Sequence, residues 1–260
     1  MQKRTFLMSV LALALLGGAQ AADLLDAVKQ RGSLKIAVEG TYPPFNYRQD
    51  GKLTGFDVEI AELLAKKLGV KAEFVTVEWS GILAGLQAGK YDVIVNQVAA
   101  TDKRREVLDF TQPYVYSGAQ LIVRKDDKRN FKGLEDLKGK KLGVGQGSNF
   151  AELAKSVEGV EVKTYPGAPE YLQDLALGRV DAALNDSLLI PYLVKQTKLP
   201  LKGGAPVGKE ESNAIPYPKG NPQFGAALDK ALADIKADGS FRKVSIKYFE
   251  RDVSKPLAAK

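Results

Sequence analysis

The chain has 260 residues, of which 45% are hydrophobic and 27% charged, a composition typical of a soluble globular protein with one large or two medium domains. Its formal charge of +7 comes from basic and acidic residues interleaved along the chain, so we predict no nucleic-acid-binding face. The sequence contains neither Cys nor His, which excludes disulfides, Cys or His nucleophiles and His- or Cys-based zinc sites. No carboxylate-rich metal loop is found either, and we expect neither metal nor cofactor.

Residues 1–21 have the pattern of a cleavable signal peptide. Lys3 and Arg4 precede an apolar stretch over residues 6–16, and Ala19-Gln20-Ala21 fits the small-x-small cleavage rule. The apolar stretch is too short to span a membrane stably, and a lipoprotein would need a Cys at the cleavage site. We therefore expect cleavage near Ala21-Ala22 and a free exported protein, with the periplasm as its location.

The first α/β unit opens with a predicted helix over residues 23–31 and a strand over residues 34–38. Glu39 begins a loop that ends at Phe45 and contains two prolines, which restrict its backbone. Such a loop can hold Tyr42 and Phe45 at a binding site with little loss of entropy. The alternative is that both rings pack on their own core.

A second strand and the only Trp follow. Residues 56–68 have helical spacing of apolar residues, and residues 71–77 are predicted to form a strand. Trp79 lies just after that strand and before a predicted helix over residues 81–88. The side chain could cover a ligand or fill the core, and its position after a strand end favours the cover.

Residues 93–106 pass from a short apolar strand into a helix. Thr101 is a good N-cap residue, and Arg104 lies one turn into the helix. A guanidinium beside the free N–H groups of a helix N-terminus makes an anion site of the right size for one carboxylate. The alternative is a plain strand and turn with a solvated Arg.

The second α/β unit begins with an extended run over residues 114–123, whose centre is predicted to cross between domains. A strand over residues 142–144 leads to a loop at residues 145–149, where backbone N–H groups and the Ser148 hydroxyl could bind a small anion. The alternative is a strand-to-helix turn with a Ser cap. A further strand is predicted over residues 160–165, followed by a helix over residues 168–177.

An internal repeat relates the two units. Residues 86–96 match residues 175–185, and each copy contains a helix end, Gly, a basic residue, Asp, an apolar strand and Asn. The match places Gln97 opposite Asp186, at strand carboxyl ends, where ligands of α/β sheets bind. Arg104 and Asp186 would then offer opposite charges that suit a zwitterion. Asp186 could instead cap the helix predicted over residues 187–197, unless Ser187 takes that role.

The C-terminal part returns to the first unit. A short edge strand is predicted over residues 214–216, and helices over residues 224–238 and 240–248 should pack on the first unit because no new strand follows for them to cover. We therefore predict a discontinuous lobe 1 of residues 22–116 and 213–260 and a lobe 2 of residues 117–212. Segments 115–119 and 209–213 would form the hinge.

Six segments together resemble the periplasmic solute-binding proteins of polar amino-acid ABC importers. They are EGTYPPF at 39–45, LTGFDV at 53–58, TDKR at 101–104, DFTQPY at 109–114, LKGKKLGV at 137–144 and GRVDA at 178–182. The resemblance implies a two-lobed α/β periplasmic-binding-protein fold of type II. Each lobe would contain a mixed sheet flanked by helices, with a ligand cleft between the lobes that closes on the ligand. It also implies permease subunits as partners, no enzymatic activity and a monomer.

The resemblance also assigns roles to residues. It implies that Arg104 binds the ligand carboxylate and Asp186 the ammonium. It also implies that Thr101, Ser148 and Asn149 assist in binding and that Tyr42 and Trp79 flank the ligand side chain. The remaining residues of the predicted site are Glu39, Phe45, Asn96, Gln97 and Ala99.

Within this family the chain is most similar to the cystine-binding branch, through segment 39–45 and Asn96-Gln97-Val98. Branches for basic amino acids and glutamine tend to carry small hydroxyl residues at positions 96, 97 and 99. The resemblance implies L-cystine as ligand, or cysteine, with another polar amino acid as the alternative. A few relatives are cyclohexadienyl dehydratases with a catalytic Glu where Asp186 stands, which leaves an enzyme as the less favoured reading.

Overall fold

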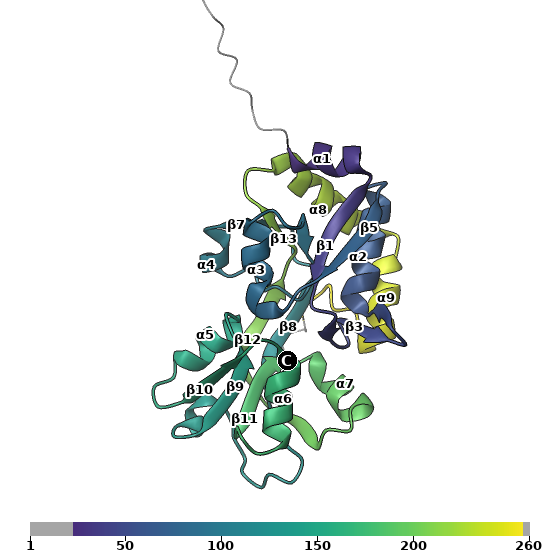
Figure 1. The fold of residues 1–260 in the computed structure, drawn as a ribbon. Coiled ribbons are helices and arrows are strands. Elements are labelled where there is room, and N and C mark those ends of the chain that lie inside the picture. Colours follow the sequence, from purple (N-terminus) through teal and green to yellow (C-terminus); the bar gives the residue numbers. More distant parts are fainter. Residues whose placement is uncertain (1–22, 257–260) are drawn as a thin grey trace, which may run out of the picture.

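The computed structural model describes residues 23–256, which form two lobes (Figure 1). The predicted signal peptide lies outside these residues. Within the described range, no helix combines the length and apolar character needed to cross a membrane.

Lobe 1 contains a parallel three-stranded sheet in the order β5-β1-β6. Its strands are β1 (Ser33–Val38), β5 (Lys71–Thr76) and β6 (Val93–Ile94). Side chains alternate between the two faces of a strand, so Ile36 and Val38 enter one buried cluster while Ala37 enters another. Both faces are covered, as expected for a parallel sheet.

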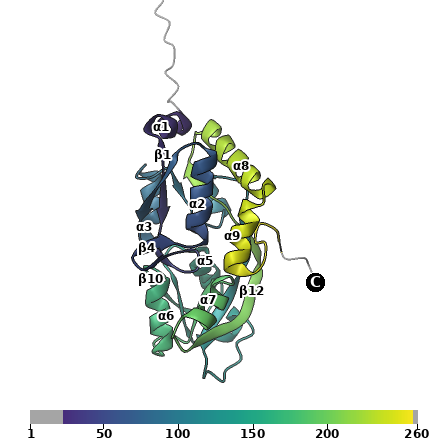
Figure 2. The ribbon, with the colours of Figure 1, turned by 90° about the vertical axis from the view of Figure 1, so that its right-hand side faces the viewer.

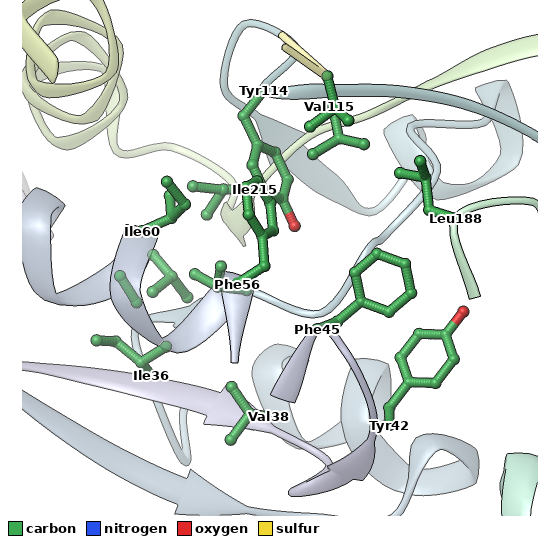
Figure 3. Packing of buried hydrophobic residues seen from close by; sticks show 14 of the residues in the cluster. Ile36, Val38, Tyr42, Phe45, Phe56, Ile60, Tyr114, Val115, Leu188 and Ile215 are labelled. Carbon is green, nitrogen blue, oxygen red and sulfur yellow. The ribbon is translucent and has the colours of Figure 1, made fainter. Parts of the chain in front are cut away.

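The helices of lobe 1 come from both ends of the chain. They are α1 (Leu24–Arg31), α2 (Phe56–Lys67), α3 (Trp79–Gln87), α4 (Asp102–Arg105), α8 (Pro222–Ala237) and α9 (Ser240–Phe249). Helices α8 and α9 pack against α2 (Figure 2), which confirms that the C-terminal helices return to the first unit. In the core of this lobe, Phe56 at the start of α2 stacks on Tyr114 (Figure 3). Its ring also packs edge-on against Phe241 of α9.

Two small antiparallel sheets complete lobe 1. One contains β2 (Thr41–Tyr42), β3 (Asn46–Gln49) and β4 (Lys52–Thr54), and the other pairs β7 (Leu108–Phe110) with β13 (Pro216–Pro218). The predicted edge strand at 214–216 therefore lies two residues later than expected.

Lobe 2 contains a mixed five-stranded sheet in the order β10-β9-β11-β8-β12. Its strands are β8 (Val115–Arg124), β9 (Lys141–Gly145), β10 (Glu161–Tyr165), β11 (Ala182–Asp186) and β12 (Leu201–Asn213). Strands β10, β9 and β11 are parallel, whereas β8 is antiparallel to both β11 and β12. The helical elements of this lobe are η1 (Leu134–Leu137), α5 (Asn149–Lys155), α6 (Ala168–Ala176) and α7 (Leu189–Gln196).

Strands β8 and β12 connect the two lobes (Figure 1). They pair over most of their length, to Asn213 opposite Val115. No strand was predicted over residues 201–208, and Gly203, Gly204 and Pro206 disfavour one there. Pairing with β8 imposes the extended conformation there, and a register shift between Gly203 and Pro206 accommodates these residues. The predicted lobe boundaries at residues 116 and 213 fall within these two strands.

Candidate functional site

A cavity lies between the lobes at the carboxyl ends of their strands. Glu39 follows β1, Asn96 follows β6, Gly145 ends β9 and Asn185 belongs to β11, and all four line the cavity. The space not filled by atoms is about 420 Å3, part of it open to solvent. Strand ends of the two units therefore face each other, as the repeat predicted.

Seven of the predicted site residues line this cavity: Glu39, Tyr42, Trp79, Asn96, Gln97, Ser148 and Asn149. Six further lining residues were not predicted: Gly145, Phe150, Gly167, Ala168, Tyr171 and Asn185. Asn185 could have been found from the repeat, which equates it with Asn96. The approach of α6, which brings Gly167, Ala168 and Tyr171, has no signal in the sequence.

The lobes touch each other around the cavity. The Tyr42 hydroxyl of lobe 1 donates a hydrogen bond of 2.7 Å to Asn185 Oδ1 of lobe 2. On another side, the Arg104 guanidinium donates to the carbonyl of Gly147 at 3.2 Å. A Cβ added to Gly145 would lie 3.4 Å from Trp79 Cδ1, an ordinary van der Waals contact, so the indole of lobe 1 packs close to the backbone of lobe 2 at this position.

Arg104 is buried beside the cavity rather than in its lining. The guanidinium also donates to the carbonyl of Ala99 at 2.8 Å and lies 5.5 Å from the centre of the Trp79 ring. Burial lowers the pKa of this guanidinium, and no carboxylate of residues 23–256 forms an ion pair with it. Since a guanidinium has five N–H donors, Arg104 retains donors for an anion.

Thr101 and Ala99 support the segment that carries Arg104. Thr101 is the N-cap of α4, and its hydroxyl accepts a hydrogen bond of 3.4 Å from the Arg104 N–H. Ala99 contributes its backbone carbonyl to the guanidinium. Neither residue lines the cavity.

Asp186 is also buried next to the cavity wall, beside Asn185. One carboxylate oxygen accepts from the Ser117 hydroxyl, and the other accepts from the Leu188 N–H at 2.8 Å. Burial raises the pKa of Asp186 from 3.8 to about 6, and the carboxylate forms no ion pair within the described residues. The suggestion that Ser187 frees Asp186 by capping the next helix is wrong, because α7 begins at Leu189 and has no side-chain cap.

Ser148 caps a helix, as one of the two alternatives considered for the loop at 145–149 predicted. Its hydroxyl caps α5 by accepting from the Ala151 N–H at 3.0 Å, and it donates to the Gly145 carbonyl at 2.7 Å. The same residue lines the cavity. Asn149, next to it, donates to Glu211 at 2.8 Å.

Glu39 and the neighbouring amides form the lobe 1 wall of the cavity. Asn96 Nδ2 donates to Glu39 Oε2 at 2.7 Å, and burial raises the Glu39 pKa from 4.5 to about 7. Gln97 has a φ of 52°, in the left-handed region that residues other than Gly rarely adopt.

Phe45 lies in the hydrophobic core rather than in the cavity. Its ring is fully buried and packs against Tyr42, with ring centres 4.8 Å apart (Figure 3). It also packs against Phe249, with ring centres 5.6 Å apart. The sequence predicted the same position, at the site or in the core, for both aromatics of the 39–45 loop. The loop instead turns one ring inward and leaves the other at the cavity.

Comparisons with known proteins support the resemblance found in the sequence. A family model described as bacterial extracellular solute-binding proteins, family 3, matches residues 34–251. The chain is 43% identical over 259 residues to the L-cystine-binding protein TcyJ of Escherichia coli K12, spanning 97% of each. It is 37% identical over 240 residues to the L-cystine-binding protein TcyA of Bacillus subtilis, covering 91% of this chain and 88% of the relative.

Among solved structures, an ancestral arginine-binding protein bound to arginine matches with a TM-score of 0.80 and 38% identity. The match covers 84% of this chain and 99% of that chain. The α/β fold is therefore shared with an arginine-binding protein whose structure was solved with arginine bound.

Proposed function

Because the chain belongs to the bacterial extracellular solute-binding proteins of family 3, we propose that it is the amino-acid-binding receptor of an ABC importer. In this proposal it captures its ligand in the periplasm between the two lobes and delivers it to permease subunits in the membrane. One observation carries the proposal. Arg104 and Asp186 are buried, opposite in charge and without ion-pair partners in residues 23–256, and they flank one cavity from opposite lobes.

The α-amino and α-carboxylate groups of an amino acid match this arrangement. A buried charge is unfavourable unless it is paired, so Arg104 favours a carboxylate and Asp186 an ammonium. Thr101, Ser148 and Asn149 assist from the two helix starts. The pair of Arg104 with the carboxylate and the pair of Asp186 with the ammonium form together only when the lobes approach. The ligand therefore binds the closed form more tightly than the open form, and this difference in affinity drives closure.

We propose L-cystine as the ligand, with cysteine as second choice. Two relatives named as cystine-binding proteins are 43% and 37% identical to this chain over most of its length. The side chain would lie against Tyr42 and Trp79, and sulfur packs favourably against aromatic edges, at about 0.3–1.5 kcal/mol per contact. Asn96 and Gln97 place neutral amides in the cavity wall, which favour neither charge of the second zwitterion of cystine.

Arginine is a further candidate, because the matched solved structure holds arginine and a carboxylate, Glu39, lines the cavity. However, the raised pKa of Glu39 and its hydrogen bond from Asn96 make it a weak partner for a guanidinium. We propose no catalytic activity, since Asp186 stands where dehydratase relatives have Glu.

Calorimetric titration of refolded, ligand-stripped protein tests the assignment. Cystine, cysteine, arginine, glutamine and glutamate are compared at one pH and temperature. We expect cystine to bind most tightly. Tighter binding of arginine or glutamine by tenfold would overturn the cystine assignment and leave the amino-acid receptor in place, and no binding of any amino acid would overturn both.

A further inference from the structure

Asp57 is a fully buried carboxylate that does not line the cavity. It lies in the first turn of α2 and forms no ion pair within the described residues. One oxygen accepts from Gln97 Nε2 at 2.7 Å and from the Tyr114 hydroxyl at 2.9 Å, and the other accepts from Asn46 Nδ2 at 3.3 Å. Burial raises the Asp57 pKa from 3.8 to about 7. Burying a carboxylate without an ion pair is unfavourable, which indicates that Asp57 has a functional role.

The donors to Asp57 are the groups that hold the lobe 1 wall of the cavity. Gln97 lines the cavity, and its backbone N–H, in the left-handed conformation, donates to the Tyr114 hydroxyl at 3.2 Å. Asn46 also donates to Asn96 Oδ1 at 2.8 Å, so Asp57 supports both cavity amides. The Tyr114 ring is fixed in turn by stacking on Phe56 (Figure 3).

The same hydrogen bonds continue through both crossing strands to Asp186. Gln97 Oε1 accepts from Asn213 Nδ2 of β12 at 3.3 Å. That amide also donates to Ser117 Oγ of β8 at 3.2 Å, and Ser117 donates to Asp186. A continuous buried network therefore joins α2 of lobe 1, the two connecting strands and the proposed ammonium partner in lobe 2.

The direction of every bond in this network follows from Asp57. Above its pKa of about 7 the Asp57 carboxylate is ionised and only accepts, so the NH2 group of Gln97 points at it and the amide oxygen points away. That oxygen takes a proton of Asn213, whose NH2 group also occupies a lone pair of Ser117. The hydroxyl proton of Ser117 is then directed at Asp186.

We propose that Asp57 is a positioning residue of the ligand site, which sets the orientation of Gln97 and, through Asn213 and Ser117, of the Asp186 carboxylate. Asp57 acts without touching the ligand. The inference rests on the proposed function, since it presumes an amino acid bound beside Asp186.

The test compares Asp57→Asn with Asp92→Asn. Asp92 is a second buried acid of lobe 1, at the end of the sheet away from the cavity, where it accepts from the Lys35 N–H at 2.7 Å. Asparagine at position 57 presents an NH2 group to at least one of three donors, so part of the network is lost. Titration with cystine should show affinity about tenfold weaker for Asp57→Asn. Asp92→Asn should lower the melting temperature and leave the dissociation constant within about twofold.

A double-mutant cycle separates positioning from a merely structural role. Ser117→Ala breaks the same network at its other end, so its effect on affinity should be smaller in the Asp57→Asn background than in wild type. If the two effects on affinity multiply, Asp57 and Asp186 are not coupled through this network, and the inference is overturned.

Two controls keep the outcome clear. If Asp57→Asn does not fold by circular dichroism, Tyr114→Phe, which removes only the hydroxyl, takes its place with the same expectation. If Arg104→Ala abolishes binding while the network variant binds as wild type, this inference fails alone. If Arg104→Ala also binds normally, the proposed site itself is wrong.

Discussion

The two copies of the repeat, residues 86–96 in lobe 1 and 175–185 in lobe 2, have the same conformation at one end and different partners at the other. In each copy a helix stops at a Gly in the left-handed conformation, with φ of 68° at Gly89 and 75° at Gly178. A residue other than Gly is disfavoured in that conformation, which explains the Gly in both copies.

The shared Asp makes the same contacts in both lobes. Asp92 accepts from the Lys35 N–H at 2.7 Å, and Asp181 accepts from the Lys141 N–H at 2.9 Å. In each case the partner lies at the start of the neighbouring parallel strand. This end of the repeat fixes strand to strand and is remote from the cavity.

The copies differ where their strands end. Asn96 bonds to Glu39 within lobe 1, whereas Asn185 accepts from Tyr42 across the cavity. The next residue is Gln97 in one copy and Asp186 in the other. The comparison shows one scaffold used twice, with the difference in charge confined to the strand ends that face the cavity.

The largest effect is expected from Arg104→Ala, which removes the cation that follows the first copy of the repeat in the sequence. Breaking a buried pair with the ligand carboxylate costs about 3–5 kcal/mol, or roughly a 10²–10³-fold loss of affinity. Calorimetry measures the loss, and circular dichroism should show an intact fold. A change of less than tenfold would contradict the proposed carboxylate site.

Asp186→Asn removes the charge that distinguishes the second copy. A neutral amide leaves the ligand ammonium unpaired, so we expect affinity to fall by roughly 2–5 kcal/mol. The matched measurement uses a des-amino analogue of the ligand on wild type. If that analogue binds as tightly as the amino acid, Asp186 does not bind an ammonium.

The helices and strands of this molecule could be predicted from the sequence better than the residues that line its cavity. Periodicity and Gly stops located most helices and strands, and the repeat placed Gln97 and Asp186 at facing strand ends. Phe45 and Tyr42 could not be told apart, because the turn of a loop decides which ring is buried. Asp57 was missed because an acid in the first turn of a helix is ordinary, and its partners come from Asn46, Gln97 and Tyr114, which only the folded chain brings together.

Lowering the pH should weaken the ligand affinity of the same site by a smaller and graded amount. The pKa of Asp186 is about 6 without ligand, and a bound ammonium favours the charged form and lowers that pKa. Affinity should therefore be full above about pH 7, fall as the pH drops through 6, and be about tenfold weaker at pH 5 than at pH 7.

Calorimetry at several pH values, repeated in two variants, assigns this dependence. Charged groups that act on Asp186 include Arg251 and Glu211, while Tyr42 faces it from lobe 1. Glu39 titrates near pH 7, so Glu39→Gln should retain the fall below pH 6, whereas Asp186→Asn should lose it. The same fall in both variants would assign the titration to another group.

The smallest effect is expected from Tyr42→Phe. This change removes the hydroxyl of lobe 1 that donates to Asn185 of lobe 2. The hydroxyl bond to Asn185 joins the lobes and is neutral, so its net contribution is about 0.5–1.5 kcal/mol. Because this bond forms only when the lobes touch, its loss favours their separation and should weaken affinity by roughly 2- to 12-fold. Small-angle scattering should then need a higher ligand concentration to reach the compact profile, while the profile at saturation stays that of wild type. Unchanged affinity and unchanged scattering would show that the contact between Tyr42 and Asn185 does not contribute to closure, and that the second copy acts through Asp186 alone.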